Sequence, residues 1–368
     1  MEEKLKHELI DRNKRIIDMI IEKINKDCPN TIDLIGIGGS FCSGDIYEKS
    51  DLDLLIIKND ESAGVLDKCF ILKDIGFDIY TQDWNHFEKM TEYNNPYVTK
   101  LFDLDIVYIK NEEVLNKYIS LRNKVKENMN DTESINKKIG YHFVNVLNSY
   151  KLLNETDDIL IGYKNLEKII TGIEFIIYMV NRTYVKKGIK RIPEEISNMK
   201  ILPDNFMDTY LDITNCSTLK EMNFKSTILI NSIKKLLDSM SIDYNLDIPL
   251  EEVHEKNPIT SSDIIGTYEE IYSNYKNKMY HAVNINDRYL SFKTMAGCQI
   301  FYDDITNNYD IEPINLIDKY DKDDLMKNAI SFDNAMEEWK KLYDKLGVNI
   351  NYYDNIEELE NDYINKRR

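Results

Sequence analysis

Two aspartates separated by one residue are the side chains best placed to do chemistry in this sequence: Asp51 and Asp53. On a β-strand, side chains alternate between the two faces, so these carboxylates would share one face, about 7 Å apart. At an effective dielectric of about 20, like charges at that distance repel by about 2 kcal/mol. A divalent cation relieves this repulsion, and carboxylate oxygens with open coordination positions suit Mg²⁺ or Mn²⁺. The pair therefore predicts a metal site.

A turn that contains two glycines precedes the aspartates: Gly38-Gly39-Ser40. The glycines let backbone amides approach an anion closely, and Ser40 adds a hydroxyl at the start of a short helix. Two other glycine motifs are excluded. A dinucleotide fingerprint needs glycine where Phe41 stands, and a P-loop needs a Gly-Lys-Ser/Thr ending that this segment lacks. We therefore predict a phosphate cradle beside the metal site.

The first 110 residues alternate apolar strand patterns with helical ones. Apolar residues near helical spacing predict a helix over residues 1–27, and Asp83 is a candidate helix N-cap. The expected strands are Thr31–Ile37, Leu52–Lys58, Phe77–Thr81 and Ile106–Ile109. This region is expected to be a small mixed sheet with intervening helices.

After residue 110 the pattern becomes almost entirely helical, which makes the expected fold class α+β. The expected helices are Glu112–Asn128, Ile135–Leu153, Ile159–Lys187, Phe206–Ser239, Ser261–Ala282, Asp287–Asp303 and Ile356–Arg368. Breaks near Asn130-Asp131-Thr132 and at Asp247-Ile248-Pro249 or Asn257-Pro258 divide the chain. We predict a catalytic domain over 1–130, a helical substrate-binding domain over 131–247 and a mostly helical region over 248–368.

Gly39-Ser40, ten intervening residues and Asp51-Leu52-Asp53-Leu54 resemble the signature of the nucleotidyltransferase superfamily that includes polymerase beta. The closer resemblance is to its bacterial antibiotic nucleotidyltransferases, which act on aminoglycosides or lincosamides, and it covers about the first 110 residues. It implies a polymerase-beta-like domain in which Asp51 and Asp53 bind Mg²⁺ and Gly39 and Ser40 bind ATP or another nucleoside triphosphate. The implied reaction transfers AMP from ATP to a hydroxyl of a small acceptor and releases pyrophosphate.

The same resemblance implies a third carboxylate on a later strand, which would complete the metal site or deprotonate the attacking hydroxyl. Asp78 is preferred because it lies within an expected strand, whereas its competitor Asp105 begins one. In antibiotic-modifying relatives a glutamate of the helical domain can act as the base. Glu167 and Glu174 are the candidates here, without support from a motif.

Composition limits the partners and the compartment. The formal charge is −18, which disfavours duplex nucleic acid and favours a cationic acceptor such as an aminoglycoside. Five widely spaced cysteines without a C-x-x-C pair fit free thiols in a reducing cytosol. The absence of any run of about 18 apolar residues argues against a membrane span. The expectation is a cytoplasmic antibiotic-resistance enzyme whose triphosphate Lys137, Lys138 or Lys151 could reach.

Two other classes remain open. One is an enzyme of the same fold that modifies a protein or a nucleic-acid end, as in toxin–antitoxin pairs. The other is a nucleotide-binding module that retains the fold without turnover, although the intact Asp51 and Asp53 pair speaks against it. The acceptor, the preferred base, the oligomeric state and the role of residues 248–368 are left undetermined by the sequence.

Overall fold

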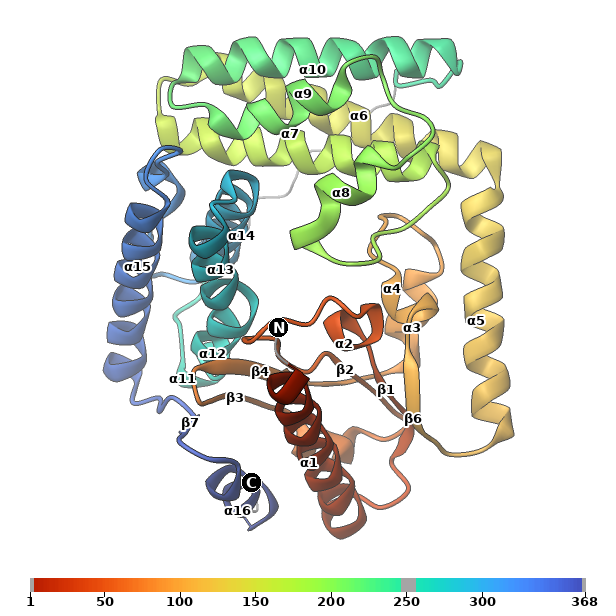
Figure 1. The fold of residues 1–368 in the computed structure, drawn as a ribbon, viewed down its shortest axis with the longest axis vertical. Helices are drawn as coiled ribbons and strands as arrows, with labels where there is room; N and C mark the ends of the chain where they lie inside the picture. The colour runs from red at the N-terminus through yellow and green to blue at the C-terminus, as the bar shows by residue number, and fades with distance from the viewer. Residues whose placement is uncertain (1–2, 246–255, 366–368) are drawn as a thin grey trace.

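A computed structural model of the chain describes residues 3–245 and 256–365. Two small β-sheets with their covering helices occupy one end of the molecule, and a layer of long helices occupies the other (Figure 1). This arrangement confirms the expected α+β class.

The first sheet brings the glycine turn and the aspartate pair to the same edge. Its strands are β1 (Ile32–Ile37), β2 (Leu54–Lys58), β5 (Thr81–Gln82) and β6 (Asp105–Ile109), in the order β5-β2-β1-β6. β1 runs antiparallel to β2 and to β6, and β2 runs parallel to β5. Because Ile37 pairs with Leu54, the residues that follow β1 lie beside those that precede β2.

The second sheet contains a strand that the sequence patterns did not indicate and one from the far end of the chain. Its order is β4-β3-β7, with β3 (Lys68–Leu72), β4 (Ile75–Ile79) and β7 (Tyr352–Tyr353). Lys73 and Asp74 both have positive φ, as a two-residue hairpin turn of type I′ requires. Only Tyr80 separates β4 from β5, so the strand expected at Phe77–Thr81 is divided between the two sheets.

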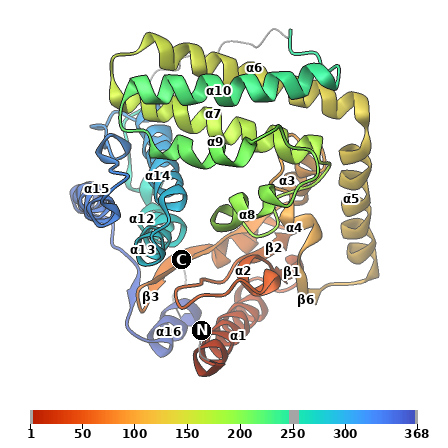
Figure 2. The same cartoon turned by 45° about the horizontal axis from the view of Figure 1, so that its top comes forward.

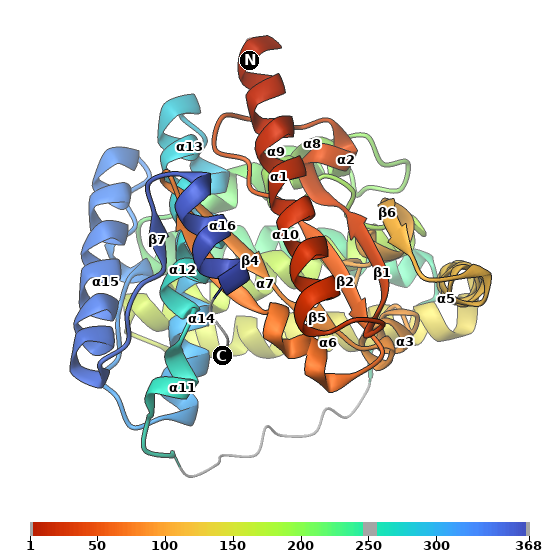
Figure 3. The ribbon, with the colours of Figure 1, turned by 90° about the horizontal axis from the view of Figure 1, so that it is seen from below.

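Helices of the first region pack around these sheets. They are α1 (Glu3–Asp27), α2 (Gly39–Ser43), the 3-10 turn η1 (Glu61–Leu66), α3 (Trp84–Met90) and α4 (Thr99–Phe102). Asp83 caps α3 as expected, since its side chain accepts the His86 N–H. α1 lies beside α16 (Ile356–Asn365), and Arg15 joins them through ion pairs with Glu357 and Glu360 (Figure 3).

The long helices form a layer above the sheets (Figure 2). The layer consists of α6 (Thr132–Glu155), α7 (Ile159–Val180) and α10 (Leu219–Ser239), with the short α9 (Phe206–Asp212) and the 3-10 turn η3 (Ile213–Asn215). α5 (Glu112–Asn130) runs down one side of the molecule from this layer toward the sheets, and the 3-10 turn η2 (Ile189–Arg191) and α8 (Ile192–Ser197) lie between the layer and the sheets. α7 ends at Val180 rather than at the expected Lys187, because Asn181 caps it and Arg182 adopts positive φ. The freed residues form a loop.

The helix expected from Ser261 to Ala282 is broken. Its pieces are α11 (Ser261–Ile264), α12 (Thr267–Ile271), the π-helical turn η4 (Tyr272–Lys276) and α13 (Asn277–Ile285). The first break comes at Gly266, whose φ of +88° ends α11. α14 (Arg288–Asn308), the 3-10 turn η5 (Ile317–Lys319) and an unexpected α15 (Leu325–Leu346) follow.

Two of the chain breaks predicted from sequence were used as domain boundaries. α5 ends at Asn130 and α6 begins at Thr132, while Asp247-Ile248-Pro249 lies outside the described residues. The region 248–368 returns to the sheets through β7, α12 and α16.

All five cysteines are free, as expected, and four of them are buried. None of the helices in the described ranges is long and apolar enough to cross a bilayer.

Candidate active site

The glycine turn is fitted against the second aspartate of the pair. The Gly38 N–H donates to the Asp53 carbonyl oxygen at 2.8 Å. Gly39 has φ of +61°, and a Cβ on it would lie 1.6 Å from the Asp53 Oδ2 atom. No other residue type fits this position without moving the carboxylate or the turn. The local sequence therefore fixes the Asp53 carboxylate directly against the proposed phosphate cradle.

Ser40 contributes a polar atom that lacks a partner. Its hydroxyl oxygen is buried, and nothing in the described part of the chain forms a hydrogen bond with it. A buried hydroxyl without a hydrogen bond costs free energy, so such atoms are rare unless a ligand, ion or water satisfies them. Because Ser40 also lines the pocket at the aspartate pair, this hydroxyl is available to a ligand bound at the turn.

Asp51 and Asp53 lie in the segment just before β2, and not within the strand as expected. The expected alternation still holds, because Leu52 between them is buried while both aspartates line the same pocket. The Asp51 Oδ2 atom accepts a hydrogen bond from the Ser273 hydroxyl at 3.0 Å. Burial raises the pKa of Asp51 above its usual range, and the nearby Asp53 carboxylate raises it further.

Asp78 lies on β4 and is half-buried. Burial, the Asp53 carboxylate and Glu270 raise the pKa of Asp78 to about 6. Asp78 therefore interacts with the aspartate pair, although it does not line the same pocket. Its competitor Asp105 is exposed at the first residue of β6, opposite Ile37, and does not line the pocket either.

The side chains around Asp51 and Asp53 supply some of the ligands that a hard divalent cation needs. Within 3–245 and 256–365, no three His, Cys, Asp or Glu side chains come together in a group that could hold a metal ion. Asp51 and Asp53 supply oxygen ligands, and Mg²⁺ is usually held by one or two carboxylates with waters and substrate phosphates. A metal bound together with a triphosphate is compatible with these two carboxylates.

The pocket around the pair has a volume of about 410 Å³ and carries more positive than negative side chains. Three aspartates line it, namely Asp51, Asp53 and Asp103. Six lysines line it as well: Lys49, Lys100, Lys186, Lys187, Lys190 and Lys278. Although the whole chain is acidic, this pocket is suited to an anion.

Three of these lysines come from a basic loop, residues 186–191, which includes the 3-10 turn η2 and begins at the last two residues of the helix expected over Ile159–Lys187. Glu195 holds the loop by accepting the backbone N–H groups of Lys186 and Lys187, the latter at 2.6 Å. Next to it, the Val185 N–H donates to the Pro96 carbonyl oxygen at 3.1 Å. The sequence signal for this loop was its run of lysines around Gly188.

The basic loop also contacts the segment between α2 and β2. Arg191 Nη2 lies 2.7 Å from the Asp45 Oδ1 atom, and Lys190 Nζ lies 3.4 Å from its Oδ2. Lys190 Nζ also lies 4.4 Å from the centre of the Tyr47 ring. Asp45 therefore neutralises part of the charge that the loop brings to the pocket.

The helix residues considered from sequence lie elsewhere. Lys137, Lys138 and Lys151 do not line the pocket, and Lys138 donates to the Glu92 carbonyl oxygen. Glu167 and Glu174 are also absent from the lining and are buried in ion pairs with Lys293, at 2.6 and 3.2 Å. Their carboxylates stabilise the contact between α7 and α14 rather than facing the pocket.

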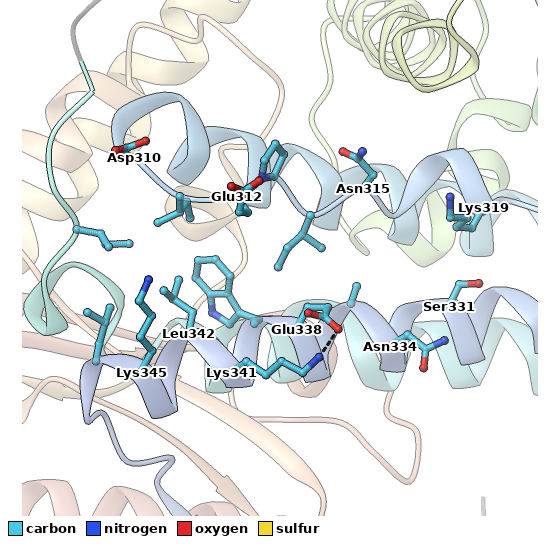
Figure 4. A pocket seen from close by; sticks show the side chains of 17 residues that line it. Asp310, Glu312, Asn315, Lys319, Ser331, Asn334, Glu338, Lys341, Leu342 and Lys345 are labelled. Atoms are coloured by element: carbon cyan, nitrogen blue, oxygen red, sulfur yellow. Dashed lines mark hydrogen bonds and ion pairs between the residues drawn. The ribbon is translucent and has the colours of Figure 1, made fainter.

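A larger pocket, of about 860 Å³, lies between α15 and the segment that follows α14 (Figure 4). Trp339 and Leu342 line it, and Lys341 forms an ion pair with Glu338 across its wall. None of the residues predicted to carry chemistry lines this pocket.

No protein-family model matches the chain, and no curated protein matches it. Among solved structures, it is similar to a nucleotidyltransferase-like protein from Exiguobacterium sibiricum 255-15. The two are 13% identical over 58% of this chain and 71% of that chain, with a TM-score of 0.36. A likeness this low carries no argument about activity.

Proposed function

We propose that this protein is a metal-dependent nucleotidyltransferase. It transfers a nucleoside monophosphate, AMP from ATP, to a hydroxyl group of a small acceptor and releases pyrophosphate. The observation that carries the proposal is the fit of Asp53 against Gly39, beside the unpartnered buried hydroxyl of Ser40. An anion bound to the turn would satisfy that hydroxyl and bring its phosphates to the aspartate pair.

In this proposal Asp51 and Asp53 hold Mg²⁺ or Mn²⁺, which when bound supplies Lewis-acid polarisation of a phosphoryl oxygen. Gly39 and Ser40 hold the triphosphate through the backbone amide and the hydroxyl. The pocket lysines balance the negative charge of the phosphates. These roles divide the site into an acidic edge and a basic wall.

Asp78 is the proposed third carboxylate. A group can accept a proton at neutral pH and still drive its transfer when its pKa lies near the working pH. The pKa of about 6 satisfies that condition for Asp78, which would accept the proton of the attacking hydroxyl or support the metal site.

The acceptor is proposed to be a small molecule with a free hydroxyl. The charge of −18 favours a cationic acceptor such as an aminoglycoside, which would make the protein a resistance enzyme. The excess of lysines over aspartates in the pocket gives that choice no support. Neutral and anionic hydroxyl compounds therefore belong in the same screen.

The test is pyrophosphate release from MgATP with a panel of aminoglycosides, lincosamides, neutral sugars and sugar phosphates. Wild type is expected to turn over with at least one acceptor, and Asp53→Asn to lose the activity. Asp310→Asn makes the same change in the larger pocket and should retain it. Equal turnover by wild type and Asp53→Asn would refute the site. Label transferred from ATP to protein or RNA in a lysate would instead identify a macromolecular acceptor.

A further inference from the structure

A serine from the C-terminal region contacts the aspartate pair. Ser273 belongs to the π-helical turn η4, and its side chain is buried, with 5% of the residue exposed. Its hydroxyl donates to Asp51 Oδ2 at 3.0 Å across 222 residues of sequence. The sequence did not indicate a role for the C-terminal region. This contact connects that region to the candidate active site.

The backbone at Ser273 is held firmly against β4. A Cβ on Gly76 would lie 2.4 Å from the Ser273 nitrogen and 3.0 Å from the Glu269 carbonyl oxygen. The π turn therefore lies directly on the strand that carries Asp78, at a distance only glycine allows. π-helical turns insert one extra residue into a helix and occur often at functional sites. Here the turn places Ser273 and Asn274 toward the pocket.

The hydrogen bond restricts one carboxylate of a pair that repel each other. A hydroxyl that donates to Oδ2 restricts the rotation of the Asp51 carboxylate, and each carboxylate oxygen has more than one lone pair, so a metal ion could still bind. Lys278, one turn further along, lines the same pocket and donates to the Asn274 carbonyl oxygen at 2.7 Å. The segment thus supplies a hydrogen-bond donor and a positive charge to the same edge.

We propose that Ser273 is a positioning residue that orients the Asp51 carboxylate for metal binding, so that the π turn η4 is part of the active site. The proposal rests on the proposed function, because it takes Asp51 to be a metal ligand. Ser273 acts through Asp51 and takes no direct part in the reaction. Residues that orient a metal ligand commonly affect metal affinity when they are removed.

The experiment measures Mn²⁺ binding to the full-length protein without substrate, by the electron paramagnetic resonance signal of free Mn²⁺, and again with a non-hydrolysable ATP analogue. Ser273→Ala is expected to weaken Mn²⁺ binding about 3- to 10-fold, the effect of losing one hydrogen bond. Ser273→Thr keeps the hydroxyl and should bind within about 2-fold of wild type. Ser226→Ala removes another buried serine hydroxyl, on α10 outside the pocket, and should change nothing.

Steady-state kinetics then separate positioning from general damage. With Ser273→Ala, the Mg²⁺ concentration at half-maximal rate should rise by the same factor, while the rate at saturating Mg²⁺ stays within about 3-fold. Urea unfolding verifies that each variant is folded. If Ser273→Ala does not fold, Ser273→Cys replaces it in the experiment. The thiol is a weaker hydrogen-bond donor, so the Mn²⁺ affinity of this variant should lie between those expected for wild type and Ser273→Ala.

Two failures are distinguishable. If Ser273→Ala binds Mn²⁺ as wild type does while Asp51→Asn loses binding, the positioning role is refuted and the metal site stands. If wild type and Asp51→Asn bind Mn²⁺ equally, with and without the analogue, the metal site is refuted and both proposals fall.

Discussion

Of two pockets compared in the described part of the chain, the smaller one holds a buried polar atom without a partner. The larger, at α15, encloses about 860 Å³, and its Lys341 is paired with Glu338 at 2.5 Å while the Trp339 indole donates to Thr267. The smaller encloses about 410 Å³ and contains an unpartnered hydroxyl at Ser40 and a half-buried Asp51 with a raised pKa. The volume of a pocket shows only where packing leaves space. A buried polar group without a partner costs stability, and inside a pocket a bound ligand can satisfy it.

The sharpest test of this difference substitutes a glycine of positive φ near each pocket. Gly39→Ala should reduce activity by about 100-fold or more, since the new Cβ displaces Asp53 and misplaced catalytic groups cost that much. Gly347→Ala, after α15, meets no atom within 4 Å and has φ of +68°. It should cost about 1 kcal/mol of stability and leave activity unchanged. Initial rates and urea unfolding measure both, and equal activity of the two variants would contradict the assignment.

The second test removes one positive charge from each pocket. Lys278→Met should raise the KM for ATP about 10-fold, because hydrogen bonds to charged groups contribute about 1.5–3 kcal/mol. Lys345→Met in the larger pocket should leave the KM unchanged. A matching rise in both variants would mean that only the overall charge matters.

The third test uses pH and needs no substrate. The pKa of Asp78 is about 6 in the folded state, above its unfolded value of 3.8, so the folded protein binds the extra proton. The Asp78 carboxyl should therefore contribute a fall in stability of about 1–3 kcal/mol as pH rises from about 4 to 6. Asp78→Asn should flatten that fall, and Asp310→Asn should not. Urea unfolding with EDTA at pH 4.5 and 7 gives the slopes, and an unchanged slope in Asp78→Asn would count against a perturbed carboxyl.

The smallest expected effect concerns the ion pairs at each pocket. Asp45→Asn frees Lys190 and Arg191 from a neutralising carboxylate, so the KM for ATP should fall about 2- to 3-fold. Glu338→Gln breaks the pair with Lys341 and should leave that KM unchanged. Titration of ATP against initial rate gives both values, and an increase with Asp45→Asn would show that the contact positions the loop.

The parts of the site that sequence could predict were local. The edge of β1, the glycine turn and the aspartate pair lie within 25 residues, where residue type and spacing determine the conformation. The metal roles of Asp51, Asp53 and Asp78 remain predictions. Phosphate binding at Gly39 and Ser40 is likewise untested.

The rest depended on long-range contacts. β3 has an apolar run of only four residues, Cys69 to Leu72, and its neighbour β7 lies far along the chain. Ser273 approaches Asp51 only after the π turn packs on Gly76, and no spacing in the sequence encodes that approach. The start of the basic loop was mispredicted because the helix was expected to run to Lys187, whereas Asn181 caps it and Arg182 adopts positive φ.

The parallel pairing of β7 with β3 has a consequence for how the protein folds during synthesis. The Ile71 N–H donates to the Asn351 carbonyl oxygen. This hydrogen bond can therefore form only after residue 351 has left the ribosome. Until then the β3–β4 hairpin has an open edge beside a nascent helical layer, and open edges favour pairing with other chains. Translation that stalls in α15 should therefore leave an aggregation-prone product, whereas release past β7 closes that edge.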